Sequence, residues 1–359
     1  MKKLVLLLLL LFVVQLSNGQ QKAHILSLKD SSSFSFVLLP DVQNYVKYDY
    51  NQPVLELLTA WIADNVNNLN IKAALCTGDL VDQNECLVPP FPRFGNQTST
   101  QQWEFVSRAF NRLDNILPYI ISTGNHDYGY TRAETPESHF PEHFTVERNN
   151  QFSNCLVAVY NNRLGVPTLE NAAYAFTEKH WGKILVIALE YGARDQVLQW
   201  AKELCGSENF RDHKVIVLLH SYMGSGYNAP LLGKDHYKMT PLNGGKDVWE
   251  KLLSQTNNIR LLICGHYAEA NENFADNVGF RTDKNKAGND VIQMMFNTQA
   301  LGGGLSGNGG DGWLRVLEFM PDGKTVHVIT YSPLFAFSPR TKHLAVDTAP
   351  YNSFSFIIE

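Results

Sequence analysis

The segment Gly124-Asn125-His126-Asp127 places an amide, an imidazole and a carboxylate side by side on the chain. It follows the apolar run 117–121, so it is predicted to be a tight loop at the end of a buried strand. Amide and carboxylate oxygens bind metal ions, and an imidazole can exchange a proton near neutral pH. Because the same residues are also common in ordinary turns, a metal site requires matching ligands at the ends of other strands.

Four further apolar runs, at 35–39, 71–76, 215–219 and 260–264, also end in possible ligands. These ligands are Asp41, then Asp79 and Asp82, then His220, and finally His266. A single Asp or His at a strand end is more often a helix cap or a turn residue. The carboxyl ends of parallel strands share one edge of a sheet, however, so five such ends favour a common metal site.

The elements that must position these ligands alternate between strand and helix patterns, which is typical of an α/β fold. Apolar periodicity predicts helices within 55–69, 103–113 and 197–204. Further strands are predicted at 172–176, 183–189, 291–296, 313–319 and 325–331, with a hairpin turn at 320–323. Segment 129–170 lacks periodicity and is predicted to be a long insertion folded over the site. No repeat or linker is evident, which predicts a single catalytic domain at 20–359 with a β-rich portion at 291–359.

Composition and the N-terminus indicate the class of protein and its destination. With 44% hydrophobic residues and a net charge of -5, the 359-residue chain has a globular composition and no basic surface specific for nucleic acid. Lys2-Lys3, the apolar run 4–14 and Ser17-Asn18-Gly19 are typical of a cleaved secretory signal peptide at 1–19. The apolar run is too short to span a bilayer, and no later segment could do so. A secreted or periplasmic protein is therefore expected.

Five cysteines leave at least one thiol unpaired in such a protein. Cys76 and Cys264 lie within apolar strands and are predicted to be buried core residues. If one disulfide exists, two of Cys86, Cys155 and Cys205, which are predicted to lie in loops, would form it.

The five ligand blocks, in this order, resemble the calcineurin-like metallophosphoesterase superfamily, whose blocks are Asp-x-His, Gly-Asp-x-x-Asp, Gly-Asn-His-Asp, a strand-end His and Gly-His-x-His. The corresponding residues here are Asp41-Val42-Gln43, Gly78-Asp79-Leu80-Val81-Asp82, Gly124-Asn125-His126-Asp127, His220 and Gly265-His266-Tyr267-Ala268. Gln43 and Ala268 stand where histidines are usual. The resemblance implies a two-sheet β-sandwich flanked by helices, in four layers ordered α/β/β/α.

Three C-terminal blocks are similar to a secreted branch of this superfamily, in which a Gln also follows the first Asp. They are Asn297-Thr298-Gln299, the segment 310–315 and Tyr331-Ser332-Pro333. This similarity indicates that Gln43 is a feature of that branch.

The resemblance implies two divalent or trivalent metal ions, with Mn, Zn, Fe, Mg and Ca as candidates. Both ions would share Asp79. One ion would also bind Asn125, His220 and His266, which gives a complete set of ligands.

The other ion would bind Asp41 and Gln43 in addition to Asp79. Because both of its usual histidines are missing, this first site is expected to be weaker. Asp82, Glu269 or Glu272 could supply a replacement ligand. An oxygen-rich set of this kind favours Mn, Mg or Ca over Zn.

A two-metal site implies hydrolysis of a small-molecule or macromolecular phosphate ester, either a monoester or a diester. The nucleophile would be a metal-bound hydroxide, His126 would be the general acid for the leaving group, and Asp127 would orient His126. The substitutions at Gln43 and Ala268 motivate an alternative, which is a catalytically weakened protein that binds metal or phosphate on the same fold. The presence of both His126 and Asp127 favours the enzyme.

Overall fold

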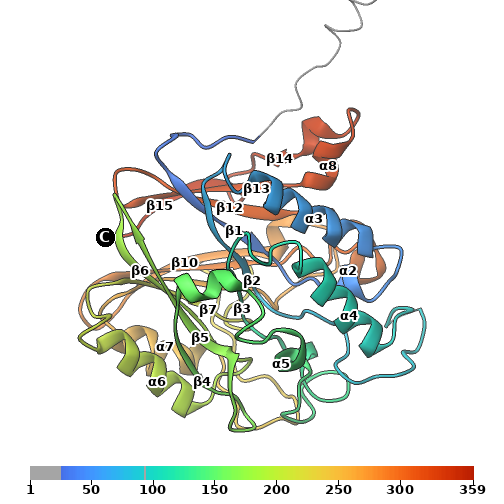
Figure 1. Cartoon of the computed structure of the whole chain (residues 1–359), viewed down its shortest axis with the longest axis horizontal. Helices are drawn as coiled ribbons and strands as arrows, with labels where there is room; N and C mark the ends of the chain where they lie inside the picture. The colour runs from blue at the N-terminus through green and yellow to red at the C-terminus, as the bar shows by residue number, and fades with distance from the viewer. Residues whose placement is uncertain (1–25, 93) are drawn as a thin grey trace, which may run out of the picture.

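The fold is a sandwich of two β-sheets with helices on both outer faces (Figure 1). It is seen in a computed structural model that describes residues 26–92 and 94–359. The predicted signal peptide at 1–19 lies outside the described residues.

The first sheet has seven strands in the order β14-β13-β12-β1-β2-β3, with β15 paired to β13. The strands β1, β2 and β3 are parallel to one another, whereas β12 to β15 form antiparallel pairs. Their bounds are β1 Phe34–Leu39, β2 Ile71–Cys76, β3 Tyr119–Ile121, β12 Leu314–Phe319, β13 Thr325–Tyr331, β14 Val346–Asp347 and β15 Ser353–Ile357.

The second sheet has eight strands in the order β4-β5-β6-β7-β9-β11-β10-β8. Its centre, from β6 through β7 and β9 to β11, is parallel. The bounds are β4 Leu156–Asn161, β5 Pro167–Glu178, β6 Gly182–Ala188, β7 Lys214–Leu218, β8 Gly226–Tyr227, β9 Ile259–Cys264, β10 Val278–Lys284 and β11 Asp290–Phe296.

Helices cover the two outer faces. The helices α3 (Gln52–Asn65) and α4 (Ser99–Phe110) pack on the first sheet, while α6 (Asp195–Gly206) and α7 (Gly245–Lys251) pack on the second (Figure 1). Shorter helices are α2 Gln43–Val46, α5 Phe140–His143 and α8 Pro333–Phe337. The predicted four-layer α/β/β/α architecture is confirmed.

Aromatic side chains fill the interface between the two sheets. Phe36 of β1 lies 5.5 Å from Phe176 of β5, measured between ring centroids, and Phe319 lies 4.8 Å from Trp181. Strand β1 is buried along its whole length because the helices cover one face and the second sheet covers the other. The apolar runs of the sequence predicted this strand and its parallel neighbours correctly.

Two predictions need correction. Segment 129–170 is not an unstructured insertion throughout, because α5, β4 and the first residues of β5 lie within it. None of the five cysteines forms a disulfide, and all five are buried thiols. Cys205, predicted to lie in a loop, packs inside α6. The predicted burial of Cys76 and Cys264 is confirmed.

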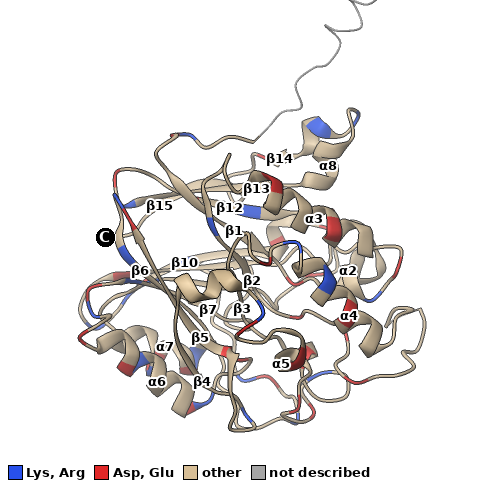
Figure 2. Cartoon of the chain, viewed as in Figure 1, with Lys and Arg blue, Asp and Glu red and all other residues tan. Residues whose placement is uncertain are grey.

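Charged residues of both signs are interspersed over the helices and loops (Figure 2). Within the described part of the chain, no helix combines the length and the apolar character needed to cross a bilayer.

Candidate metal centre

Two groups of parallel strands direct their carboxyl ends toward one site. Strands β1, β2 and β3 are followed by Asp41, Asp79 and Asn125. In the second sheet, His220 follows β7 and His266 follows β9. The site is therefore built by both layers of the sandwich, and residues more than 200 positions apart meet there.

The glycines that precede two of these ligands allow the loops to approach closely. A Cβ atom at Gly124 would clash with the carboxylate and backbone of Asp79, and one at Gly265 would clash with Asp41 and Thr77. Asp79 and His266 themselves have left-handed backbone conformations, with φ of 47° and 67°. Non-glycine residues seldom adopt this conformation, which is typical of strain held at functional sites.

Asp79, His220, His266 and Asn125 form one compact group of potential ligands. The ligand atoms of Asp79, His220 and His266 lie within 4.8 Å of one another. His220 Nε2 is 3.3 Å from Asp79 Oδ2, 3.1 Å from His266 Nδ1 and 3.1 Å from Asn125 Oδ1. These four residues are the set predicted for the complete metal position.

Hydrogen bonds outside this group orient its side chains. His220 Nδ1 lies 2.9 Å from the Thr77 carbonyl oxygen, and a carbonyl can only accept, so Nδ1 carries a proton and Nε2 faces the other ligands. Asn125 Nδ2 donates to Tyr237 Oη, which turns Asn125 Oδ1 toward His220. His266 Nε2 lies 3.8 Å from Asp235 Oδ1. Outer contacts of this kind fix ligand orientation in metal sites.

Burial and mutual charge shift the pKa values of the three titratable ligands, His220, His266 and Asp79. Burial alone would lower the pKa of His220, but the charges of Asp79 and Asp41 raise it to about 10. Burial and the charge of His220 lower the pKa of His266 to about 4. Burial opposes ionisation of Asp79, yet His220 and the neighbouring histidines hold its pKa well below the usual range. The acidic neighbours of His220 thus favour a positive charge at this place, which a proton or a bound metal ion could supply.

The residues predicted for the other metal position are arranged differently. Gln43 lies in contact with Asp79, to which its Nε2 donates over 3.1 Å, while its Oε1 is buried without a hydrogen-bond partner. Asp41 is fully buried, and burial raises its pKa to about 6, although His220 lowers it. Its oxygens accept from Thr77 Oγ1, the His266 backbone amide, Asn297 Nδ2 and Gln299 Nε2.

The residues considered as replacement ligands do not join this group. Asp82 forms an ion pair with Lys47 at 3.4 Å and accepts a hydrogen bond from Gln83. Glu269 is exposed and accepts from Tyr267 Oη. The carboxylates of Asp82 and Glu269 are thus engaged with other side chains, and Glu272 is exposed and does not line the pocket. Ala268, where the family has its last His, lines the pocket and offers only a methyl group.

His126 stands beside the ligands, but Asp127 does not contact its imidazole. His126 Nδ1 lies 2.6 Å from the Asp82 carbonyl oxygen, so Nδ1 is the donor and Nε2 is the nitrogen free to exchange a proton with a substrate. The Asp127 carboxylate instead accepts from the backbone amides of Leu80, Val81 and Gly124. The predicted orientation of His126 by Asp127 would therefore act through the backbone of the loops and not through a contact with the imidazole. The Asp127 carboxylate joins the loop that contains Asp79 to the loop that contains His126.

Gln43, Asp79, Asn125, His126 and His266 line a pocket of about 400 Å³, while His220 and Asp41 are fully buried behind them. Arg132, Tyr237, Gln299 and Lys47 line it too, and none of them was predicted as a site residue. Gln299 and Asn297 follow strand β11, which is parallel to β9, so the rule that ligands gather at strand ends could have identified them. Arg132 and Tyr237 lie in loops with no motif.

The two predicted metal positions differ in how many suitable ligand atoms they offer. The imidazole nitrogens of His220 and His266 and the oxygens of Asp79 and Asn125 suit a divalent ion. At the other position, the partnerless Gln43 Oε1 is a suitable oxygen donor beside the shared Asp79. The residues present can therefore hold one ion with four ligands and a second with fewer.

Known proteins share parts of this sequence and structure. The chain is 26% identical over 306 residues to the uncharacterized protein YvnB of Bacillus subtilis, an alignment that covers 84% of this chain but only 20% of that relative's length. A purple acid phosphatase from yellow lupin seeds has a TM-score of 0.48 at 16% identity, covering 91% of this chain and 54% of that one. A dimetal phosphatase from Danio rerio has a TM-score of 0.47 at 11% identity, covering 84% and 96%.

The sequence profile of the calcineurin-like phosphoesterases matches residues 34–270, which is more than half of the chain and includes every predicted ligand. This protein belongs to the calcineurin-like phosphoesterase family.

Proposed function

We propose that this protein is a secreted, metal-dependent phosphoesterase that hydrolyses a phosphomonoester or phosphodiester at a two-metal centre. The observation that carries the proposal is the convergence of Asp79, Asn125 and His266 on the buried His220, beside His126 at the wall of one pocket. Membership of the calcineurin-like phosphoesterase family supports the phosphoesterase activity, and the resemblance of the ligand blocks to that family implies the two ions.

Asp79, Asn125, His220 and His266 would hold one ion, and Asp41, Gln43 and Asp79 the other. Bound divalent ions supply a nucleophilic hydroxide at neutral pH and neutralise phosphoryl oxygens. Such an ion takes the place of the proton on His220, because a histidine must be deprotonated at the ligand nitrogen. Binding should therefore release protons and weaken in acid.

His126 would be the general acid that protonates the leaving-group oxygen. Its Nδ1 is held by the Asp82 carbonyl, so the proton that can be transferred is on Nε2. The His126 backbone amide donates to Asp79 Oδ1 over 2.9 Å, which ties the position of the acid to the shared metal ligand. Asp127 would be a positioning residue that joins the two loops.

The substrate is proposed to be a phosphate ester, with Arg132 and Tyr237 at the wall of the pocket as polar contacts for its anionic or leaving group. A cleaved signal peptide at 1–19 would send the protein out of the cytoplasm.

The test is to purify the chain from residue 20 onward, measure bound metal, and assay p-nitrophenyl phosphate and bis(p-nitrophenyl) phosphate with added Mn²⁺, Zn²⁺, Mg²⁺ or Ca²⁺. We expect turnover of at least one ester that is abolished by a chelator. His220→Ala and His266→Ala should lose both metal and activity. Full activity in either variant would refute the ligand assignment, and a folded protein inactive with every metal would refute the enzyme.

The engagement of Asp41 by four donors supports a second candidate, a metal- or phosphate-binding protein with weakened catalysis. This protein would bind one ion tightly and inorganic phosphate reversibly, without turnover. Calorimetric titration with Mn²⁺ and then phosphate, alongside the ester assay, separates the two candidates.

A further inference from the structure

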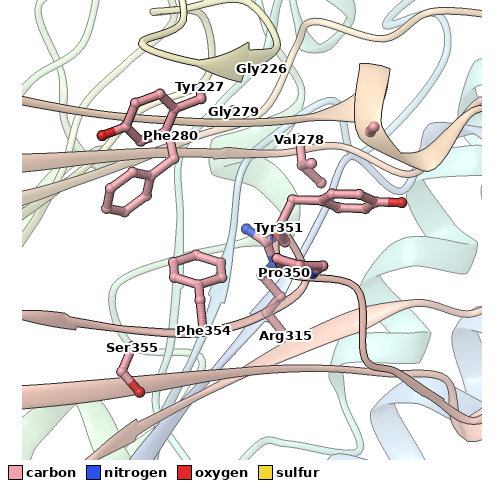
Figure 3. Close-up of a pocket in the computed structure, with 11 residues that line it drawn as sticks. Gly226, Tyr227, Val278, Gly279, Phe280, Arg315, Pro350, Tyr351, Phe354 and Ser355 are labelled. Atoms are coloured by element: carbon pink, nitrogen blue, oxygen red, sulfur yellow. The ribbon is translucent and has the colours of Figure 1, made fainter.

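A second cavity lies between the two sheets, at the edge where β8 and β10 face β12 and β15. Its volume is about 480 Å³, which is within the range of pockets that bind small molecules. It shares no lining residue with the metal pocket. Phe280 and Phe354 are in edge-to-face contact, with ring centroids 5.4 Å apart, and form part of its wall, with Tyr227, Val278 and Tyr351 near them (Figure 3).

Arg315 lies in the wall of this otherwise aromatic and aliphatic cavity (Figure 3). The side chain comes from β12 and is only 1% exposed. Its hydrogen bonds go to neutral acceptors, since Nε donates to Thr330 Oγ1 and Nη2 donates to the Tyr351 carbonyl and Asn352 Oδ1. Among the described residues, Nη1 has no acceptor and no carboxylate lies within ion-pair distance.

A buried guanidinium without a counter-ion is unusual, because removing a charge from water is costly unless the charge is paired. Burial lowers the pKa of Arg315 to about 9, and the more distant Asp347 raises it only in part. The planar group lies over Phe296, 4.4 Å from the ring centroid, and 5.7 Å from that of Phe354. These aromatic contacts hold the cation in position and leave its charge available at the cavity.

We propose that this cavity binds an amphiphilic carboxylate, whose head group pairs with Arg315 while its aliphatic or aromatic body lies against the apolar wall that includes Phe280 and Phe354. Charge complementarity determines the head group, because an arginine fork matches the geometry of a carboxylate and the lining contains no second cation for a phosphate dianion. The apolar walls determine the rest of the ligand. This inference does not depend on the phosphoesterase proposal.

The probe is octanoate, compared with octan-1-ol, which has the same tail and no charge. Isothermal titration calorimetry on the whole chain should show saturable binding of octanoate, and binding of the alcohol about ten- to a hundred-fold weaker, as expected when a charged hydrogen bond is lost. Equal affinities, or no saturable binding of octanoate, would overturn the proposal.

Two kinds of variant locate the binding. Arg315→Gln keeps donors for the backbone but removes the charge, and it should reduce octanoate affinity to that of the alcohol. Because this residue is fully buried, Ala275→Trp provides an independent test. Ala275 is half-buried at the cavity wall, and an indole there should block the cavity and abolish binding. Ala287→Trp, on an exposed turn, is the matched control. Equal octanoate binding by the two tryptophan variants would place the ligand elsewhere and refute the site.

Discussion

Replacing His126 with Ala tests the proposed general acid without removing a proposed metal ligand. The side chain is half-buried, and its Nδ1 makes one hydrogen bond with the Asp82 carbonyl. Losing that bond should lower the free energy of unfolding by about 1 kcal/mol, so the variant should fold. Loss of a positioned acid typically lowers kcat by about 100- to 10,000-fold, which corresponds to roughly 3–5 kcal/mol of transition-state stabilisation.

The leaving group makes this prediction specific. p-Nitrophenolate departs readily without a proton, whereas the phenolate of phenyl phosphate depends more on protonation. His126→Ala should therefore lose at least about ten-fold more kcat on phenyl phosphate than on p-nitrophenyl phosphate. Metal content, measured by mass spectrometry, should not change. His343→Ala, an exposed histidine outside the pocket, is the control. Equal losses on both esters, or a loss of bound metal, would refute the role of acid.

Three further predictions concern the metal pocket, the loop that holds Asp127, and the contact between Arg281 and Asp283 on strand β10. Ala268→His restores the histidine that the family has at this position, and it should raise the affinity for the second Mn²⁺ ion by at least about ten-fold, measured by calorimetry. An unchanged affinity would exclude a metal position beside Ala268. Asp127→Ala leaves three buried amides unsatisfied and should lower the free energy of unfolding by at least about 3 kcal/mol in urea, whereas a loss below about 1 kcal/mol would contradict the loop-joining role. The hydrogen bond from Arg281 lowers the pKa of Asp283 in the folded protein. The contact therefore stabilises the fold above the unfolded pKa of Asp283, near 4, and this stabilisation is lost as pH falls through the lower folded pKa. The stability difference between wild type and Arg281→Met should therefore shrink on acidification, and a constant difference would contradict this linkage.

The parallel strands and their terminal ligands could be predicted because the pattern is local. A fully buried strand is a continuous apolar run, and a residue that follows it is at the sheet edge whichever neighbours the strand has. This rule located Asp79, Asn125, His220 and His266 before any pairing was known. Helix α7 and strand β10 were missed, because their short and largely polar segments, such as GKDVWEK, carry little periodic signal.

What the pattern could not reveal is which partner each side chain takes. Asp127 is adjacent to His126 in sequence, yet the turn directs its carboxylate toward the amides of the Asp79 loop. Asp82 has the right residue type and spacing for a metal ligand, but its carboxylate forms an ion pair with Lys47, which comes from another segment. Such choices depend on rotamers and on contacts between distant segments, neither of which is encoded in the spacing of a motif.

The hydrogen bonds of Asp41 determine the order in which we expect the two metal positions to fill. Asp41 Oδ1 accepts from Thr77, while Oδ2 accepts from three donors, the His266 backbone amide, Asn297 and Gln299, which is more than the two lone pairs of that oxygen. An ion that binds through Oδ2 must displace a donor, and Gln299 Nε2, at 3.3 Å, makes the longest of these hydrogen bonds. The other position requires only that His220 lose a proton, because its ligand atoms already converge. The position with His220 and His266 should therefore fill first. The position with Asp41 and Gln43 should fill at higher metal concentration, when Gln299 moves aside.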